Sequence, residues 1–292
     1  MPNYPTNDTI TIIFNPNSTG DAPQLAQELA TQLAERLPGV PTTLTETEHA
    51  GHAEELAKTA AHKSKKPLII SVSGDGGYHE VVNGVMSAGN PGAVAAVHAA
   101  GNANDHRSAT RERPLIESIV SGPVTPLDLI KIEVAGGPLR YAHSYAGLGV
   151  TPAVAVELNR HSLNRLKEIK LVYQTLRDFR PFQIRRNHTL YTLDSLVFAN
   201  IGRMARMLKL GADNPDDGHF AVTTIPHRSK LRLLLTGLRL VTLGPAKAPD
   251  MTTYSFELIK SQPMQLDGEL LDLPAAAQVT VTSAHGALST LL

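Results

Sequence analysis

A short glycine-rich loop carries the chemistry that the sequence suggests first, Ser73-Gly74-Asp75-Gly76-Gly77. It follows an apolar run and precedes residues with helical spacing, so its backbone N–H groups would lie at the start of a helix. Such groups bind phosphate oxygens, because glycine lets the backbone come close and a helix N-terminus adds positive potential. The carboxylate of Asp75 would repel a phosphate unless it holds a metal ion or takes a proton. The loop therefore predicts a phosphate site, or else a plain tight connection.

Three standard motifs do not fit this loop. The chain contains no G-x-x-x-x-G-K-[ST] segment, so it has no P-loop of that type. The third glycine position of a dinucleotide fingerprint is His79. The pair His79-Glu80 also lacks the second histidine that a zinc-protease helix needs.

Two further loops have a similar composition, Asn15 to Gly20 and Gly101 to Asp105. Each follows an expected strand, as Gly74 to Gly77 does. The carboxyl ends of parallel strands meet at one edge of a sheet, and ligands bind there. Three such loops at one edge predict a binding site better than three accidental turns.

The elements that position these loops change in character along the chain. The first third alternates strands with helices, and the apolar run 67–73 is typical of a parallel strand buried on both faces. From about Leu127 strands predominate, which places a domain boundary near residues 122–128. We therefore expect an α/β domain over 1–126 and a β-rich domain over 127–292, whose last residues can return to the first. The expected strands are 9–14, 42–45, 67–73, 93–97, 127–134, 190–200, 219–225, 252–259 and 277–282, and the expected helices are 23–37, 51–62, 78–86 and 165–180.

Two carboxylate clusters lie in the second part. Asp267-Gly268-Glu269 could accept a proton from a substrate hydroxyl, or it could be only a turn between two strands. The segment from Asp213 to Gly218 places three carboxylates in one turn. Oxygen-rich turns suit magnesium or calcium, but aspartate-rich turns also form without metal.

Composition excludes several functions. The chain has 292 residues and 27 basic against 27 acidic side chains, so no overall charge attracts nucleic acid. Aromatic residues make up only 4% and tryptophan is absent, which argues against base stacking. Without cysteine there is no disulfide, thiolate zinc site or cysteine nucleophile. We expect neither a secretory signal nor a transmembrane helix, because the N-terminus lacks the required pattern and no apolar run reaches about 18 residues.

The loops carry a family resemblance. Asn15 to Gly20 resembles the N-P-x-S-G loop of the diacylglycerol kinase catalytic-domain family, and residues 73–84 resemble its segment G-G-D-G-T-x-x-E-V-V-N-G. The serine start and the His79-Glu80 pair are closer to sphingosine kinases. The resemblance covers nearly the whole chain and implies a Rossmann-like domain related to NAD kinases and 6-phosphofructokinases. A β-sandwich domain would follow, with the active site in the cleft between the two. Later landmarks that match in order are 47–53, 101–105, Asp128, 144–150, 217–218 and 267–269.

This resemblance implies a lipid kinase that uses ATP and Mg²⁺ to phosphorylate diacylglycerol or a related long-chain or sphingoid lipid. It places the proton acceptor in the segment 267–269, where we favour Glu269 over Asp267. Asp75 is the alternative base or the ligand of the catalytic magnesium. A structural magnesium would be held by Asn214, Asp217 and the carbonyl of His219. The contacts to ATP would come from Asn15, Thr47, Gly74, Asp75, Gly76, Gly77, Glu80, Asn102 and Asp105.

Three departures from the family pattern keep other readings open. Gly77 and Asn102 stand where the family has threonine, and Asn214 replaces an acidic metal ligand. A kinase of a soluble alcohol, or a nucleotide- or lipid-binding protein that has lost catalysis, are the alternatives. The carboxylates that catalysis needs are nevertheless kept, at Asp75, Asp105, Asp267 and Glu269.

The segment 229–240 is leucine-rich and basic. It predicts either a helix that faces the core or an amphipathic helix that docks on an anionic membrane. We therefore expect a cytoplasmic protein with a lipid substrate, peripheral at the inner face of a membrane, and no nucleic-acid partner. A homodimer is compatible with these residues, which leave the oligomeric state open.

Overall fold

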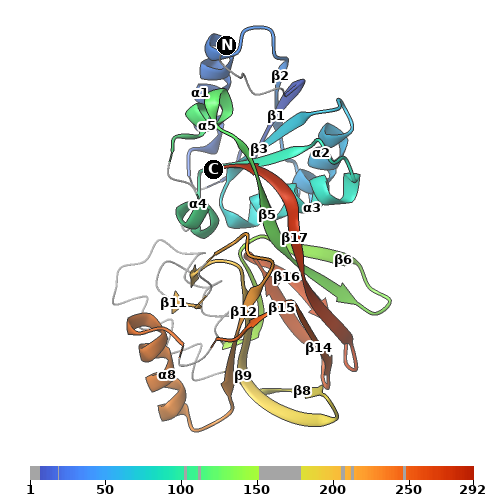
Figure 1. Cartoon of the computed structure of the whole chain (residues 1–292), viewed down its shortest axis with the longest axis vertical. Coiled ribbons are helices and arrows are strands. Elements are labelled where there is room, and N and C mark those ends of the chain that lie inside the picture. The colour runs from blue at the N-terminus through green and yellow to red at the C-terminus, as the bar shows by residue number, and fades with distance from the viewer. Residues whose placement is uncertain are drawn as a thin grey trace. The chain divides into compact units, whose positions relative to one another are not determined.

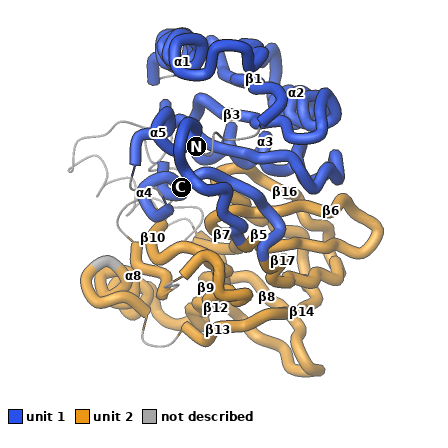
Figure 2. The backbone as a smooth tube through the Cα atoms, turned by 45° about the horizontal axis from the view of Figure 1, so that its top comes forward, with its two compact units in different colours: residues 1–127, 286–292 blue, residues 128–285 orange. Residues whose placement is uncertain are grey.

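The structure, a computed structural model, describes residues 7–18, 20–101, 104–110, 113–150, 179–204, 208–211, 214–245 and 248–292. The chain divides into two compact units (Figure 2). Unit 1 comprises Met1–Leu127 and Gly286–Leu292, and unit 2 comprises Asp128–His285. Unit 1 mixes helices with strands, whereas strands dominate unit 2, which confirms the predicted fold class (Figure 1).

A parallel sheet forms the centre of unit 1, in the order β2-β1-β3-β4, with the end of β17 beside β4. Every residue of β3 is buried, as expected for a strand with helices over both faces of its sheet. The C-terminal residues of the chain complete this unit, since the Ser118 hydroxyl donates to the carbonyl of Leu292 at 2.9 Å. The strands are β1 (Thr9–Phe14), β2 (Thr42–Glu46), β3 (Pro67–Ser73), β4 (Val94–Ala99) and β17 (Gln278–Leu291).

Helices cover the two faces of this sheet. Helices α1 and α5 share one apolar core with β1, β3 and β4, and α2 and α3 lie on the other side (Figure 1). The last two helices come close at Gly84, where a Cβ atom would lie 2.8 Å from the Cβ of Ala57, so a larger residue would force them apart. The helices are α1 (Ala22–Arg36), α2 (His52–Ala61), α3 (Asp75–Ala88), α4 (Asp105–Thr110) and α5 (Leu115–Ser121).

Unit 2 is built from antiparallel strands in the order β16-β15-β7-β9-β8-β14-β17, with β12 also paired to β9. Helix α8 (Lys230–Thr242) follows β12 in the chain. Strand β5 pairs with β17 and β6, β13 pairs with β12, and β10 pairs with β11 in a separate two-stranded sheet. The strands are β5 (Val124–Val134), β6 (Leu139–Ala142), β7 (Tyr145–Gly149), β8 (Phe182–Arg186), β9 (Thr189–Ala199), β10 (Arg203–Met204), β11 (Leu208–Lys209), β12 (Phe220–Pro226), β13 (Asp250–Met251), β14 (Thr253–Leu258), β15 (Gln262–Leu266) and β16 (Glu269–Leu273).

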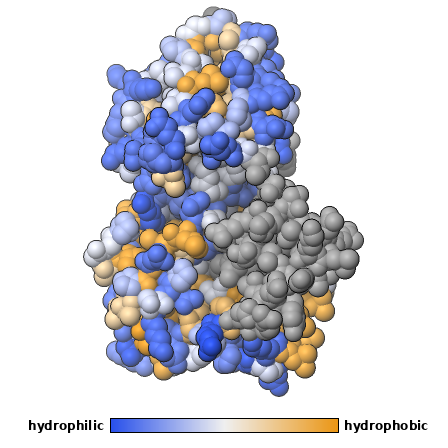
Figure 3. All heavy atoms as spheres, turned by 180° about the vertical axis from the view of Figure 1, so that it is seen from behind, coloured by the Kyte–Doolittle hydropathy of each residue, from blue (hydrophilic) through white to orange (hydrophobic). Residues whose placement is uncertain are grey.

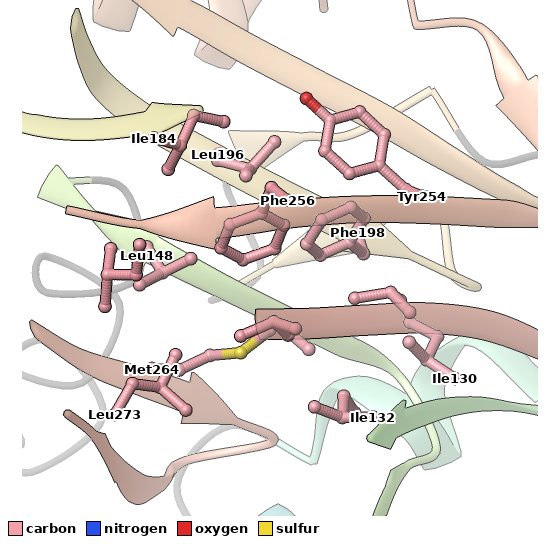
Figure 4. Packing of buried hydrophobic residues seen from close by; sticks show 14 of the residues in the cluster. Ile130, Ile132, Leu148, Ile184, Leu196, Phe198, Tyr254, Phe256, Met264 and Leu273 are labelled. Carbon is pink, nitrogen blue, oxygen red and sulfur yellow. The ribbon is translucent and has the colours of Figure 1, made fainter. Parts of the chain in front are cut away.

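Strand β9 supplies both cores of unit 2. Its Phe198 lies in an aromatic cluster, edge-on to Tyr254 with ring centroids 5.2 Å apart (Figure 4). The ring of Phe198 is also edge-on to that of Phe220, with centroids 5.7 Å apart. Burial raises the pKa of the Tyr254 hydroxyl, although Arg186 nearby acts in the opposite direction. At alternate positions of β9, Val197 and Ala199 face a second core. This core also contains two leucines of α8.

The predicted elements agree with the structure where apolar patterns are strong. Strands 9–14 and 67–73 have the predicted bounds. Helix α3 begins at Asp75 rather than Tyr78, because the glycine loop already forms its first turn. Strand β17 continues past the predicted end at residue 282 to Leu291, because its last residues join the sheet of unit 1. The helix predicted at 165–180 lies almost wholly outside the described residues.

Candidate active site

The three predicted loops of unit 1 are in direct contact. They follow β1, β3 and β4, which run parallel, so all three leave the same edge of the sheet. A Cβ atom at Gly20 would overlap the carbonyl oxygen of Ala100. A Cβ atom at Gly101 would lie 2.5 Å from the Cα of Gly74. Glycine is therefore needed for the loops to approach one another, in agreement with the sequence prediction that they meet.

The carboxylate of Asp75 joins the second loop to the third. It accepts hydrogen bonds from the backbone N–H groups of Asp105 at 2.9 Å and His106 at 3.2 Å. Asp75 and Asp105 are both buried. Hard carboxylate oxygens are the ligands that Mg²⁺ prefers. The donor set at this edge therefore fits a magnesium ion.

Ser73 explains why Gly77 has no side chain. A Cβ atom at position 77 would lie 2.7 Å from both the Cβ and the Oγ of Ser73. The Ser73 hydroxyl donates to the carbonyl of Gly74 at 2.9 Å and shares a hydrogen bond with the Ser71 hydroxyl at 2.6 Å. The family pattern has glycine at position 73 and threonine at position 77. In this chain the larger residue is at position 73 and the glycine is at position 77. The sequence analysis did not find this contact between positions 73 and 77.

Glu80 supports a neighbouring loop. Its two carboxylate oxygens accept the N–H groups of Gly51 at 3.0 Å and Ala53 at 3.1 Å, at the start of α2. Negative charge stabilises a helix N-terminus. This contact holds the loop after β2, in which the N–H of Thr47 donates to Phe14 at 2.9 Å. Glu80 therefore positions the segment that carries Thr47.

The remaining predicted nucleotide contacts are placed as follows. Asn15 is exposed after β1, and its side-chain oxygen accepts the N–H of Asn17 at 2.9 Å. Gly76 lies in the first turn of α3. Asn102 lies outside the described residues.

Asp267 and Glu269 lie in different environments within unit 2. The Asp267 backbone has a left-handed φ of 50°, and its buried carboxylate accepts three backbone hydrogen bonds. Oδ1 accepts from Ser144 at 2.9 Å and Tyr145 at 3.0 Å, and Oδ2 accepts from His143 at 2.8 Å. Asp267 thus fastens the β15–β16 turn to the start of β7.

Glu269, by contrast, is exposed at the first residue of β16. Its carboxylate has no hydrogen-bond or ion-pair partner among the residues that the structure describes. Of the two predicted proton acceptors, it is the one whose oxygens are available to a substrate. Glu269 remains a prediction in that role.

Internal hydrogen bonds hold the predicted metal turn together. Asp217 Oδ1 accepts the N–H of His219 at 2.9 Å, and Asp128 Oδ2 accepts the N–H of Gly218 at 2.6 Å. Asp213 lies outside the described residues. The described part of the turn brings no three acidic or histidine ligands together. A metal at Asn214, Asp217 and His219 therefore stays a prediction.

One other cluster has the side chains of a metal site. The ligand atoms of His49, His52 and Glu55 lie within 4.8 Å of one another. However, Nδ1 of His52 accepts the N–H of Glu48 at 3.0 Å, so the neutral ring carries its proton on Nε2. That nitrogen would have to give up its proton to bind a metal. We assign no metal to this cluster.

Two buried polar groups in unit 2 were not found from the sequence. The side-chain amide of Gln265, two residues before Asp267, is buried and has no hydrogen-bond partner in the described structure. The carboxylate of Asp194 is buried and bonds Nδ1 of His227 at 2.8 Å. In the sequence, each of these residues is only a polar residue within an apolar strand. That pattern does not show whether the side chain is buried with a function or simply exposed to solvent.

Unit 1 is therefore a parallel α/β domain with glycine loops at the carboxyl ends of its strands, and a β-rich unit follows it in the chain. Residues 9–132 match the family model described as the diacylglycerol kinase catalytic domain. This segment accordingly belongs to that family of lipid kinases, which confirms the resemblance seen in the sequence and makes its domain that of a kinase. Kinases of this family generally use ATP and Mg²⁺.

Solved structures extend the likeness over the whole fold. Two from Bacillus anthracis str. Sterne, the first described as a candidate diacylglycerol kinase and the second as a diacylglycerol kinase, have TM-scores of 0.74 and 0.70. Both are 18% identical in sequence, and each comparison covers 98% of this chain and 97% of the other. The comparison with curated protein sequences gave no match. Within the described residues, none of the helices has the length and apolar character needed to cross a membrane.

Proposed function

We propose that the chain is a lipid kinase that transfers the γ-phosphoryl group of ATP to a hydroxyl group of diacylglycerol or a related long-chain or sphingoid lipid. The observation that carries this proposal is the assembly of three glycine loops at one sheet edge, with two buried carboxylates among them. It rests on a domain match to a lipid-kinase family.

On the nucleotide side, unit 1 supplies binding and charge. The N–H groups at the start of α3 would bind phosphate oxygens, as helix N-termini do. Asn15 and Thr47 lie on adjoining loops and would contact the rest of the nucleotide. Asp75 and Asp105 would hold Mg²⁺, which when bound neutralises charge on the phosphate groups.

On the acceptor side, unit 2 supplies the base. The Glu269 carboxylate would take the proton of the acceptor hydroxyl while that oxygen bonds to phosphorus and the bond to ADP breaks. Asp267 would hold the turn that positions Glu269. A carboxylate with three N–H partners is a poor proton acceptor, because its charge is already stabilised.

The retained carboxylates Asp75, Asp105 and Glu269 favour an enzyme over a binding protein that has lost catalysis, because phosphoryl transfer is what needs them. A kinase of a soluble alcohol is less favoured, because the matching family acts on lipids. We further propose that the protein acts at the cytoplasmic face of a membrane, where such lipids reside.

A panel assay tests the function. The purified chain is mixed with ATP, Mg²⁺ and detergent micelles that carry diacylglycerol, a sphingoid base, a long-chain alcohol or no acceptor. Phosphorylated lipid is quantified together with ADP. We expect stoichiometric product and ADP with one lipid class. Turnover with glycerol but with no lipid would replace the lipid acceptor by a soluble alcohol, and ATP binding without turnover would contradict the enzyme.

A further inference from the structure

Helix α8 is apolar on two opposite sides. Leu233 and Leu240 are buried in the second core of unit 2. On the other side Leu231, Leu234, Leu235 and Leu238 are 68%, 53%, 55% and 60% exposed. Their spacing of three and four residues places them on one face of the helix. A helix that only closes a core needs one apolar face, so the second face calls for another partner.

These leucines form a patch, which we call the α8 leucine face: Leu231, Leu234, Leu235 and Leu238. Hydrophobic side chains come to the surface where α8 lies (Figure 3). Leu243, just after the helix, is also 77% exposed. Single exposed leucines need no explanation, but a contiguous apolar patch marks an interaction surface.

Positive charge flanks the α8 leucine face. Arg228, Lys230, Arg232 and Arg239 lie on the segment 227–243, which contains no aspartate or glutamate. The chain as a whole has zero net charge, so this concentration is local. A cavity of about 420 Å³ beside the helix is lined by Arg228, Arg232 and Arg239 together with apolar side chains that include Ile225 and Leu233. None of the three arginines forms an ion pair with a described residue.

We infer that α8 docks on a bilayer containing anionic phospholipid. The leucine face enters the acyl region, and the arginine-lined cavity takes lipid phosphate groups. Guanidinium groups bind phosphate in two-pronged geometry, and amphipathic helices with basic flanks bind at such interfaces. The choice of a membrane as the partner rests on the proposed function, whose acceptor lies in a bilayer. The surface itself does not depend on it.

Charge argues against a second copy of the chain as the occupant. Two α8 faces brought together would oppose four cations to four cations with no acidic residue on the segment to pair them. A bilayer with negative headgroups complements both the leucines and the cations.

Vesicle sedimentation without ATP tests the docking. Leu234→Gln and Leu190→Gln form a matched pair, since both leucines are 53% exposed in unit 2 and Leu190 is on β9. On vesicles of phosphatidylglycerol and phosphatidylcholine, Leu234→Gln should bind about tenfold or more weakly, whereas Leu190→Gln should match the wild type. Arg232→Gln with Arg239→Gln should also weaken binding, and 1 M salt should weaken the wild type.

Three results would overturn the docking. The first is a wild type that does not sediment with anionic vesicles, and the second is an equal loss of binding in the two leucine variants. The third is a wild-type dimer in sedimentation velocity that Leu234→Gln converts to a monomer. Kinase assays separate docking from function. Vesicle binding without lipid turnover would support the docking and contradict the proposed kinase activity. Turnover on dispersed short-chain lipid without vesicle binding would support the kinase activity and contradict the docking.

Discussion

Ser73 occupies the space into which a side chain at position 77 would project, since a Cβ atom there would lie 2.7 Å from the Ser73 Oγ. Residue 73 ends β3 and residue 77 lies in the first turn of α3, so this contact joins the strand to the helix of the glycine loop. The two positions are therefore coupled in size. A bulky residue at one requires a small residue at the other.

This coupling predicts a non-additive double variant. Gly77→Thr alone should lower the free energy of unfolding by about 1–3 kcal/mol, the usual effect of overpacking. Ser73→Gly with Gly77→Thr should recover most of that loss, because the clash is removed. Urea unfolding of the wild type, both single variants and the double variant measures the coupling. If the losses simply add, the two side chains do not compete for one space.

The phosphate role of the glycine loop predicts the effect of a side chain at Gly76. Gly76→Val should abolish ATP binding in calorimetry while the fold stays intact, because a side chain in the first turn of α3 would block the backbone from phosphate. Ser87→Val, near the other end of the same helix, controls for placing a branched residue in α3. Unchanged ATP affinity in a folded Gly76→Val protein would mean that phosphate binds elsewhere.

The exposed carboxylate of Glu269 predicts a specific kinetic defect. Glu269→Gln keeps the size of the side chain but cannot accept a proton, so kcat should fall by about a hundred- to ten-thousand-fold with ATP affinity nearly unchanged. Asp272→Asn, an exposed acid on the same strand, should keep normal turnover. Near-normal turnover of Glu269→Gln would move the base elsewhere, and Asp75 would become the leading candidate.

Asp267 should behave as a structural residue. In Asp267→Asn an NH₂ group replaces one oxygen and would face a backbone N–H that needs an acceptor. The free energy of unfolding should fall by about 2 kcal/mol or more, because hydrogen bonds to a buried charged group are lost. Urea unfolding measures this loss, with Asp272→Asn as the exposed control. A variant of normal stability that lacks turnover would instead assign the proton transfer to Asp267.

The sequence by itself determined the alternation of strands and helices in the first third of the chain and the place of the glycine loops. Strands 9–14 and 67–73 are buried on both faces of the sheet. A strand buried in this way needs apolar residues at almost every position, so its sequence is a continuous apolar run that can be recognised locally. Glycines follow those strands, and parallel strands direct their carboxyl ends to one edge. The segment 73–84 showed the resemblance to the family most clearly, because the spacing of its glycines reflects the local backbone geometry of the loop.

Only the tertiary structure decided what individual side chains do. Asp267 and Glu269 look equivalent in the sequence, yet backbone groups more than a hundred residues earlier occupy one and leave the other exposed. Glu80 is used at the start of α2, and the two faces of α8 differ because only one meets the sheet. Such contacts join segments that are far apart in the sequence. The periodicity of a sequence predicts which side chains share a face of an element, but it does not predict which distant group they contact.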